Sequence, residues 1–146
     1  MERRLGLDRR RVPRGGRRPG DRPGRHPTVL VADSYESAGR PCVRYLDLFN
    51  FDVVEAADGE EALAKIVARP PRVILSEWSL PVMPVPRLSQ WLAQRWRTSG
   101  IPVIVIASTD EPPIAEAAVA GVLMKPFPLK DMLEEVRRVL RNTDVK

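Results

Sequence analysis

Arg72-Val73-Ile74-Leu75-Ser76-Glu77-Trp78-Ser79-Leu80-Pro81 is the stretch around which the rest of the chain can be arranged. Two prolines precede it, so no helix can run into it from upstream. Its apolar run, 73–75, is typical of a strand buried on both faces of a parallel sheet. Because sites in open α/β sheets lie beyond the carboxyl ends of the strands, Glu77 is a candidate site residue. The alternative is a strand-end glutamate that simply faces water.

The composition indicates one cytoplasmic domain. With 146 residues, 43% of them hydrophobic, the chain is long enough for one domain with a real core. The single cysteine, Cys42, excludes an internal disulfide and a multi-cysteine metal site, and it fits a reducing compartment. No apolar run approaches the roughly 20 residues that span a bilayer, so we expect a cytoplasmic protein without membrane contact.

The positive charge is confined to the start of the chain. Residues 1–27 hold ten arginines against three acids (+7), whereas residues 28–146 hold fourteen lysines and arginines against sixteen acids (−2). Because residues 1–27 are mainly Arg, Gly and Pro, we expect a disordered basic arm before a folded domain over 28–143. Such an arm can contact phosphate backbones or an acidic surface weakly, but it has no aromatic residue for base stacking. A solvated tail, or a stretch upstream of the true start, is the favoured simpler explanation.

Strand and helix patterns alternate along the rest of the chain. Buried-strand patterns cover 28–32, 52–56, 73–75, 101–107 and 122–124. Helical patterns cover 36–49, 60–68, the stretch from Pro86 to Gly100, 114–120 and 129–141. Five strand–helix units predict an α/β fold with a parallel sheet and right-handed crossovers. The apolar faces of the first and third helices are expected to include Phe49 and Trp96. The predicted core comprises Leu30, Val31, Val54, Leu63, Ile74, Leu75, Val103, Val105 and Leu133.

Three charged residues follow alternate strands of this predicted sheet. Asp33 comes after the first strand, Glu77 after the third and Lys125 after the fifth. In a flavodoxin-like strand order of 2-1-3-4-5, the first and third strands flank the switch point, so the three side chains would converge in one cleft. The lysine would then neutralise the carboxylates or pair with a bound anion. Three unrelated surface charges are the alternative.

The order and spacing of these segments resemble the receiver domain of bacterial two-component response regulators, of the chemotaxis-regulator kind. The resemblance runs from about Thr28 to Asn142 and rests on residues 30–33, 53–63, 74–81, 101–106 and 125–127. It implies a flavodoxin-like doubly wound sheet with helices on both faces and a role in phosphorelay signal transduction. It also implies signalling partners, such as a histidine kinase or a downstream effector, and no enzymatic activity of the chain's own.

The departures from the family pattern lie at the positions that take part in phosphoryl transfer. The second acid after the first strand is Ser34, and the phosphoacceptor aspartate is replaced by Glu77. The hydroxyl residue after the fourth strand is Ala107, and the aromatic residue of the fifth strand is Val122. Ser108 carries a hydroxyl, but strand alternation predicts that its side chain faces the opposite side of the sheet from that of Ala107, unless the register slips. Among the family's site positions, only Asp33 and Lys125-Pro126 match fully.

Each departure weakens phosphoryl transfer. With one acid lost, Asp33 and Glu77 are expected to bind Mg²⁺ weakly if at all, and no other cofactor is expected. The extra methylene of Glu77 places its carboxylate more than ~1 Å beyond the aspartate position, a misplacement that can cost about a hundredfold in rate. Glu77 would instead point at Lys125 and partly stand where a phosphoryl group would be.

The sequence is therefore compatible with three functions. The first is a stand-alone pseudo-receiver that binds partners without being phosphorylated. The second is a working receiver that takes phosphate from a histidine kinase or a small donor. The third is a nucleic-acid-associated protein that acts through its arginine-rich arm.

Overall fold

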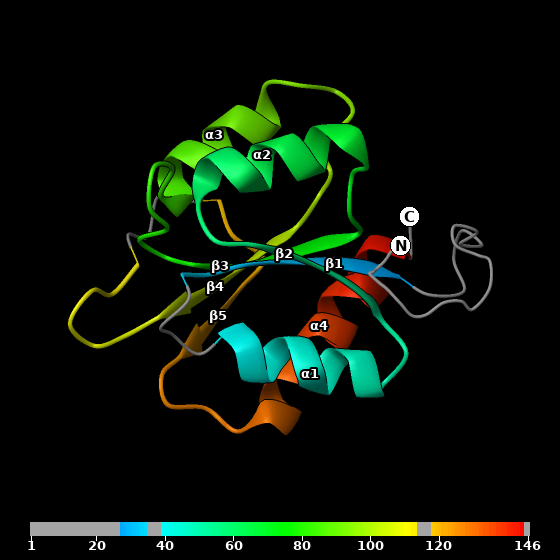
Figure 1. Cartoon of the computed structure of the whole chain (residues 1–146), viewed down its shortest axis with the longest axis vertical. Helices are drawn as coiled ribbons and strands as arrows, with labels where there is room; N and C mark the ends of the chain where they lie inside the picture. The colour runs from blue at the N-terminus through cyan, green and yellow to red at the C-terminus, as the bar shows by residue number, and fades with distance from the viewer. Residues whose placement is uncertain (1–26, 35–38, 114–117, 145–146) are drawn as a thin grey trace.

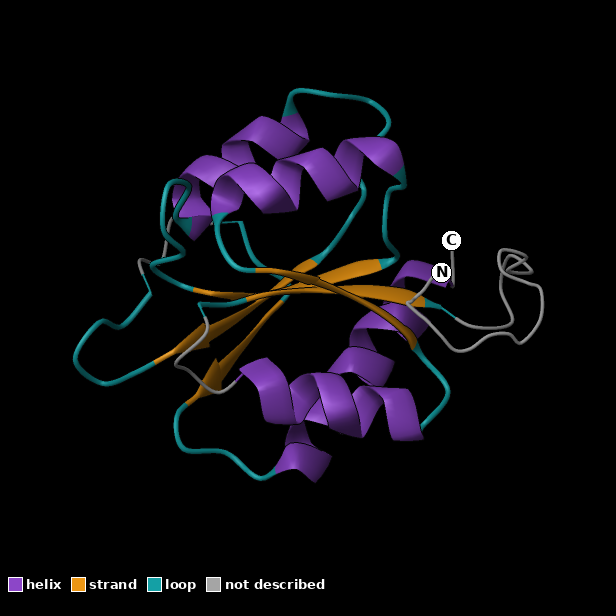
Figure 2. Cartoon of the chain, viewed as in Figure 1, coloured by secondary structure: helices purple, strands orange, loops and turns teal. Residues whose placement is uncertain are grey.

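The computed structural model describes residues 27–34, 39–113 and 118–144 of the chain (Figure 1). The predicted basic arm lies outside the described residues except for its last position. Within them, one parallel sheet is covered by helices on both faces (Figure 2).

Five strands form the sheet in the order β2-β1-β3-β4-β5, which confirms the predicted flavodoxin-like order. All neighbouring strands are parallel. The strands are β1 (Thr28–Ala32), β2 (Asp52–Ala56), β3 (Val73–Glu77), β4 (Val103–Ala107) and β5 (Gly121–Met124). Because β3 lies in the centre, between β1 and β4, its apolar run is buried on both faces, as the sequence predicts.

Four helices lie within the described ranges and form two layers. They are α1 (Gly39–Leu48), α2 (Gly59–Ala68), α3 (Val85–Ala93) and α4 (Leu129–Asp144). In Figure 1, α2 and α3 cover one face of the sheet, and α1 and α4 cover the other. Two buried clusters match these layers: Cys42 of α1 and Met132 of α4 belong to one, and Ile66 of α2 and Leu88 of α3 belong to the other.

The predicted core is confirmed for seven of the nine residues. Leu30, Val31, Ile74, Leu75, Val103, Val105 and Leu133 are buried. Val54 and Leu63 are only partly buried, and both pack against the cluster under α2 and α3. Val54 is on β2, which forms the edge of the sheet and has a strand on one side only.

Three expectations about helices need correction. Residues 118–120 of the predicted helix 114–120 are not helical, and 114–117 lie outside the described residues. The third helix ends at Ala93 rather than near Gly100, so Trp96 falls in the following turn and is 88% exposed. Phe49 follows α1 and is 41% exposed, because the helix ends at Leu48 and the ring packs sideways on Tyr45.

Gly59 allows the start of α2 to pack against the loop that follows β3. Its N–H donates to the Pro81 carbonyl at 2.8 Å, and a Cβ at this position would lie 2.8 Å from the backbone nitrogen of Met83. The Asp58 carboxylate caps the helix by accepting from the Glu61 N–H at 2.8 Å. These contacts fix the loop that leads away from Glu77.

Candidate functional site

The predicted site residues lie at the carboxyl edge of the sheet. Asp33 and Ser34 follow β1, Glu77 is the last residue of β3, Ala107 ends β4, and Lys125 follows β5. The strand ends are tied together, since the Lys125 N–H donates to the Ala107 carbonyl at 2.8 Å. Parallel strands bring these positions to one edge of the sheet, although Asp33 and Lys125 are 92 positions apart in sequence.

The Glu77 carboxyl group turns toward the end of β1. Its Oε1 accepts from the Ser34 N–H at 3.3 Å and from the Ser34 Oγ at 3.4 Å. Burial raises the pKa of Glu77 to about 7, and hydrogen bonding with the Asp33 carboxyl group and its negative charge add to this effect. The Ser34 N–H and the charge of Lys125 oppose the rise. The Glu77 and Asp33 carboxyl groups lie close together and are partly shielded from water, so they favour a proton held between them.

The expected salt bridge between Lys125 and Glu77 is wrong. Within the described part of the chain, no ion pair joins these two side chains, and Lys125 acts on Glu77 only through its charge at a distance. The physical reason is the direction of the glutamate, whose longer side chain reaches back to Ser34 and Asp33. The lysine therefore faces the same cavity without contacting the carboxylate.

A small cavity of about 80 Å³ lies between Glu77 and Lys125. Its lining includes Ala107 and also Ser108, which was expected to point away. Strand alternation does not apply to Ser108, because β4 ends at Ala107 and Ser108 begins a tight turn, in which the Glu111 N–H donates to the Ser108 carbonyl at 3.1 Å. No periodic pattern in the sequence marks a turn residue as facing a site.

Two further lining residues were missed by sequence reasoning. The Ser79 Oγ donates to the Glu111 Oε1 at 2.7 Å, so the loops after β3 and β4 meet across the cavity. Neither residue belongs to a strand end, and only the folded loops bring them together. Val122, by contrast, pairs with Val105 in the sheet, is 40% exposed and does not line this cavity.

The residues at this edge are a poor fit for Mg²⁺. The ion prefers several oxygen ligands in octahedral geometry, usually with charged carboxylates among them. Here Ser34 stands in the place of one acid, and burial and the Asp33 carboxyl group raise the pKa of Glu77 to about 7, so the charge of this second carboxyl group is only partial near neutral pH. Among the residues that the structure describes, no group of three or more His, Cys, Asp or Glu side chains is arranged to hold a metal ion.

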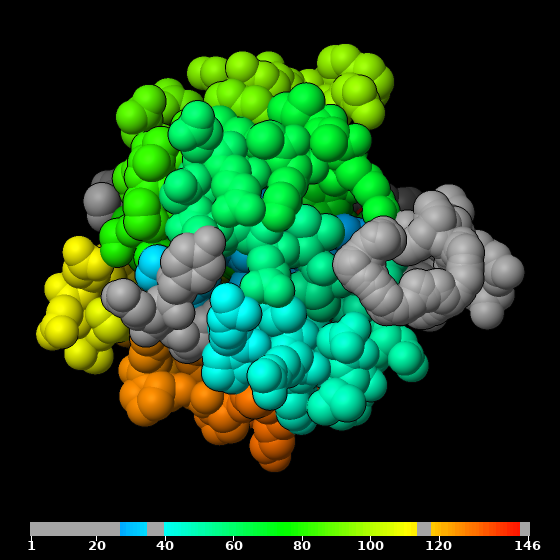
Figure 3. Space-filling model, in the orientation of Figure 1, coloured from blue at the N-terminus to red at the C-terminus, as the bar shows by residue number. Residues whose placement is uncertain are grey.

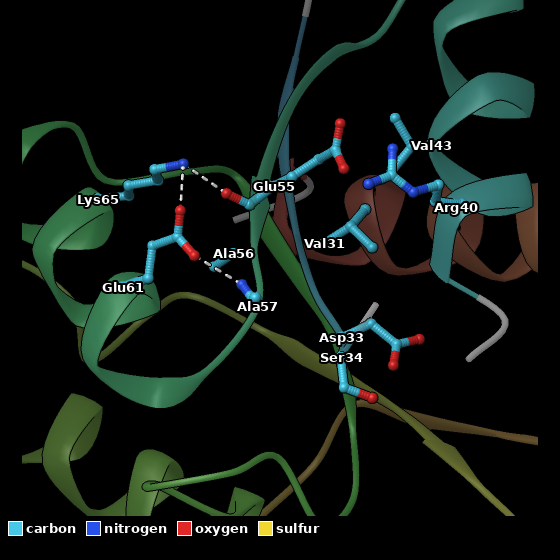
Figure 4. A pocket seen from close by; sticks show the side chains of 10 residues that line it. All are labelled: Val31, Asp33, Ser34, Arg40, Val43, Glu55, Ala56, Ala57, Glu61 and Lys65. Atoms are coloured by element: carbon cyan, nitrogen blue, oxygen red, sulfur yellow. Dashed lines mark hydrogen bonds and ion pairs between the residues drawn. The ribbon is translucent and has the colours of Figure 1, made fainter. Parts of the chain in front are cut away.

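A second cavity of about 160 Å³ lies beside β1 and β2 (Figure 4). On its α2 side, Lys65 bonds the Glu55 carbonyl at 2.6 Å and the Glu61 carboxylate at 3.1 Å. The Glu61 carboxylate also accepts from the Ala57 N–H at 2.8 Å, and this backbone bond lowers the pKa of Glu61. These charges hold the start of α2 in place, which is a structural role.

The raised pKa of Glu77 predicts a stability that falls as the pH rises. The folded chain binds a proton here up to about pH 7, whereas the unfolded chain releases it near pH 4.5, so this contribution is complete below pH 4.5 and lost by about pH 7. A shift of this size corresponds to about 3 kcal/mol without screening. Since the side chain is only partly buried, we expect a loss of ~1–2 kcal/mol.

The matched variant for this effect is Glu77→Gln, whose amide is neutral at every pH. Urea unfolding of both proteins from pH 5 to pH 8 should show the variant gaining ~1–2 kcal/mol relative to the unmodified chain across this range. The contributions of the other titrating groups cancel in the difference between the unfolding free energies of the two proteins. A difference that does not change with pH would contradict the shared proton.

No helix among the described residues is both long enough and apolar enough to cross a lipid bilayer.

Comparison with known proteins assigns the chain to a family. The family model for the response regulator receiver domain matches residues 29–137. The transcriptional regulatory protein PrrA of Mycobacterium tuberculosis is 31% identical over 119 residues, which are 79% of this chain and 50% of PrrA. The DNA-binding dual master transcriptional regulator RpaA of Synechocystis sp. is 29% identical over 122 residues, 81% of this chain and 51% of RpaA. The chain thus spans about half the length of the curated relatives it matches.

A solved structure agrees with these matches. The chemotaxis response regulator CheY4 of Vibrio cholerae is 27% identical, with a TM-score of 0.70 over 78% of this chain and 98% of that one. The family match and the 2-1-3-4-5 order of the sheet agree. The chain therefore belongs to the response regulator receiver domain family of two-component signalling.

Proposed function

We propose that this receiver domain transmits two-component signals by binding partner proteins, without accepting a phosphoryl group at Glu77. The observation that carries the proposal is the direction of the Glu77 carboxyl group. Its Oε1 is engaged by Ser34, while no ion pair links it to Lys125 within the described residues. An acceptor oxygen held against β1 is poorly placed for in-line attack on a donor that Lys125 would hold.

The electrostatics support the same proposal. A nucleophilic carboxylate must be charged, but burial and the Asp33 carboxyl group raise the pKa of Glu77 to about 7. At neutral pH a large fraction of the acceptor is therefore protonated. Ala107 adds no hydroxyl to stabilise the transferred group, although it lines the same cavity.

One observation favours the alternative of a working phosphoacceptor. Ser108 lines the cavity with Glu77 and Lys125, and its hydroxyl can supply the hydrogen bond that Ala107 cannot. This alternative still requires the Glu77 carboxyl group to leave Ser34 and to turn toward Lys125.

The partners in this proposal are a histidine kinase or a downstream effector, and the setting is the cytoplasm. The proposed role requires no enzymatic activity and no resident metal ion. We also propose that residues 1–27 form a basic arm that adds weak contact with acidic surfaces, since they carry a net charge of +7.

The test is intact-mass spectrometry of the chain after incubation with acetyl phosphate and magnesium chloride. We expect no added phosphoryl mass beyond that of a Glu77→Ala control, which corrects for reaction at other residues. Stoichiometric labelling that disappears in the control would overturn the proposal and establish the alternative.

A further inference from the structure

The outer surface of α3 and of the turn after it carries arginines and tryptophans in alternation. Arg87 and Trp91 are four residues apart on α3, so they lie on one side of the helix, and the guanidinium of Arg95, just after the helix, lies over the Trp91 ring. Trp96 and Arg97 follow in the turn. We call these five residues the α3 arginine–tryptophan surface. The opposite side of α3 is apolar and buried against the sheet.

The charge of this surface is uncompensated. Residues 85–100 contain three arginines and no Asp or Glu, although residues 28–146 as a whole carry −2, so the remainder of the domain carries −5. Within the described part of the chain, none of the ion pairs involves Arg87, Arg95 or Arg97. Guanidinium groups without carboxylate neighbours attract a polyanion more strongly than groups paired within the protein.

One aromatic group of the surface, the indole of Trp96, is available for stacking. Trp96 is 88% exposed, and Figure 3 shows the segment after α3 protruding at the top of the molecule. The Arg95 guanidinium lies 4.0 Å from the centre of the Trp91 ring, and its Nη1 donates to the Trp91 carbonyl at 2.9 Å. Arg95 is therefore already held in place beside the indole of Trp91. Binding through this side chain would lose little further conformational entropy.

From this surface we infer that the chain binds single-stranded nucleic acid. The guanidinium groups match the phosphates of the backbone, and the exposed indole of Trp96 matches the face of an unstacked base. A double helix keeps its bases stacked and offers no such face. The inference does not depend on whether Glu77 is phosphorylated.

Other anionic partners match the surface less well. A helix that lies in a lipid bilayer inserts a broad apolar face, but the apolar face of α3, with Val85, Leu88 and Leu92, is buried within the protein. An acidic peptide would satisfy the arginines and leave the Trp96 indole in water. The first residue of α3 is tied to the loop after Glu77, because the Val85 N–H donates to the carbonyl of Trp78.

The experiment is fluorescence anisotropy of labelled oligothymidylate and oligouridylate of about 12 nucleotides, titrated with the full chain and its variants at several salt concentrations. Trp96→Ala should weaken binding at least about fivefold, and Trp96→Phe should restore most of it, since a stacked base contributes that much or more. Arg95→Gln with Arg97→Gln should reduce the salt-dependence slope by about 1.4, the value for two lost contacts to single-strand phosphates.

The matched control is Arg44→Gln with Arg141→Gln, which removes the same charge from two exposed positions on α1 and α4. It should change the affinity less than about twofold. Since Arg95 also contacts Trp91 within the protein, thermal melting verifies the folding of each variant. Equal binding by Trp96→Ala, an equal loss in the control, or a preference for duplex or for vesicles of phosphatidylcholine and phosphatidylglycerol would each overturn the inference.

Discussion

Changing Ser34 to Asp, Glu77 to Asp and Ala107 to Thr in one chain should raise labelling by acetyl phosphate at least about a hundredfold over the unmodified protein. The shorter aspartate side chain at position 77 should no longer reach the end of β1, so its carboxylate is free to face the cavity near Lys125. The threonine hydroxyl at position 107 would enter the same cavity, and the aspartate at position 34 restores the acid pair that receivers usually carry after the first strand. Intact-mass spectrometry over time gives the rate.

Two further variants separate the contributions of position 77 and of Lys125 to the gain in labelling. Glu77→Asp alone should recover little labelling, because Ser34 and Ala107 are unchanged. Lys125→Met added to the triple variant should remove most of the gain, because the cation that faces the cavity is lost. A triple variant that folds, retains Lys125 and is not labelled would contradict the assignment of these residues to one phosphorylation site.

The Leu75→Ala variant should lose about 2–5 kcal/mol of unfolding free energy, as other large-to-small changes in cores do. Leu75 is 0% exposed on the central strand, where it lies between Val31 of β1 and Ile104 of β4. Its side chain belongs to the cluster under α1 and α4, so the cavity left behind has helices and strands on all sides. Urea unfolding followed by circular dichroism measures the loss.

Leu48→Ala is the matched control, because the same atoms are removed from a side chain that is 76% exposed. It should change the unfolding free energy by about 0.5 kcal/mol or less. A loss below about 1 kcal/mol for Leu75→Ala, or equal losses for the two variants, would show that β3 is not the central buried strand.

The sheet could be predicted because its signals are local. The apolar runs of β1, β3 and β4 have the length and composition of buried parallel strands, and prolines or glycines separate them from the helices. The end of α3 could not be predicted in the same way. Its apolar spacing continues to Trp96, but the chain turns after Ala93 and leaves that indole in water.

The positions of the candidate residues in the fold could be predicted better than their contacts. Asp33 and Lys125 follow strands and Glu77 ends one, so parallel topology alone brings the three to one edge. Ser79, Ser108 and Glu111 were missed or misplaced, because loops carry no periodicity from which the direction of a side chain can be deduced.

The sequence by itself determined the alternation of strands and helices, the positions of the acids and the lysine after the strands, and the departures at Ser34 and Ala107. Only the tertiary structure decided where the Glu77 carboxyl group points. Its direction, toward the end of β1 rather than Lys125, depends on burial, on a neighbouring carboxyl group and on the Ser34 N–H, which lies 43 residues away in the chain. These are energies of groups that meet only after folding, and no local pattern records them.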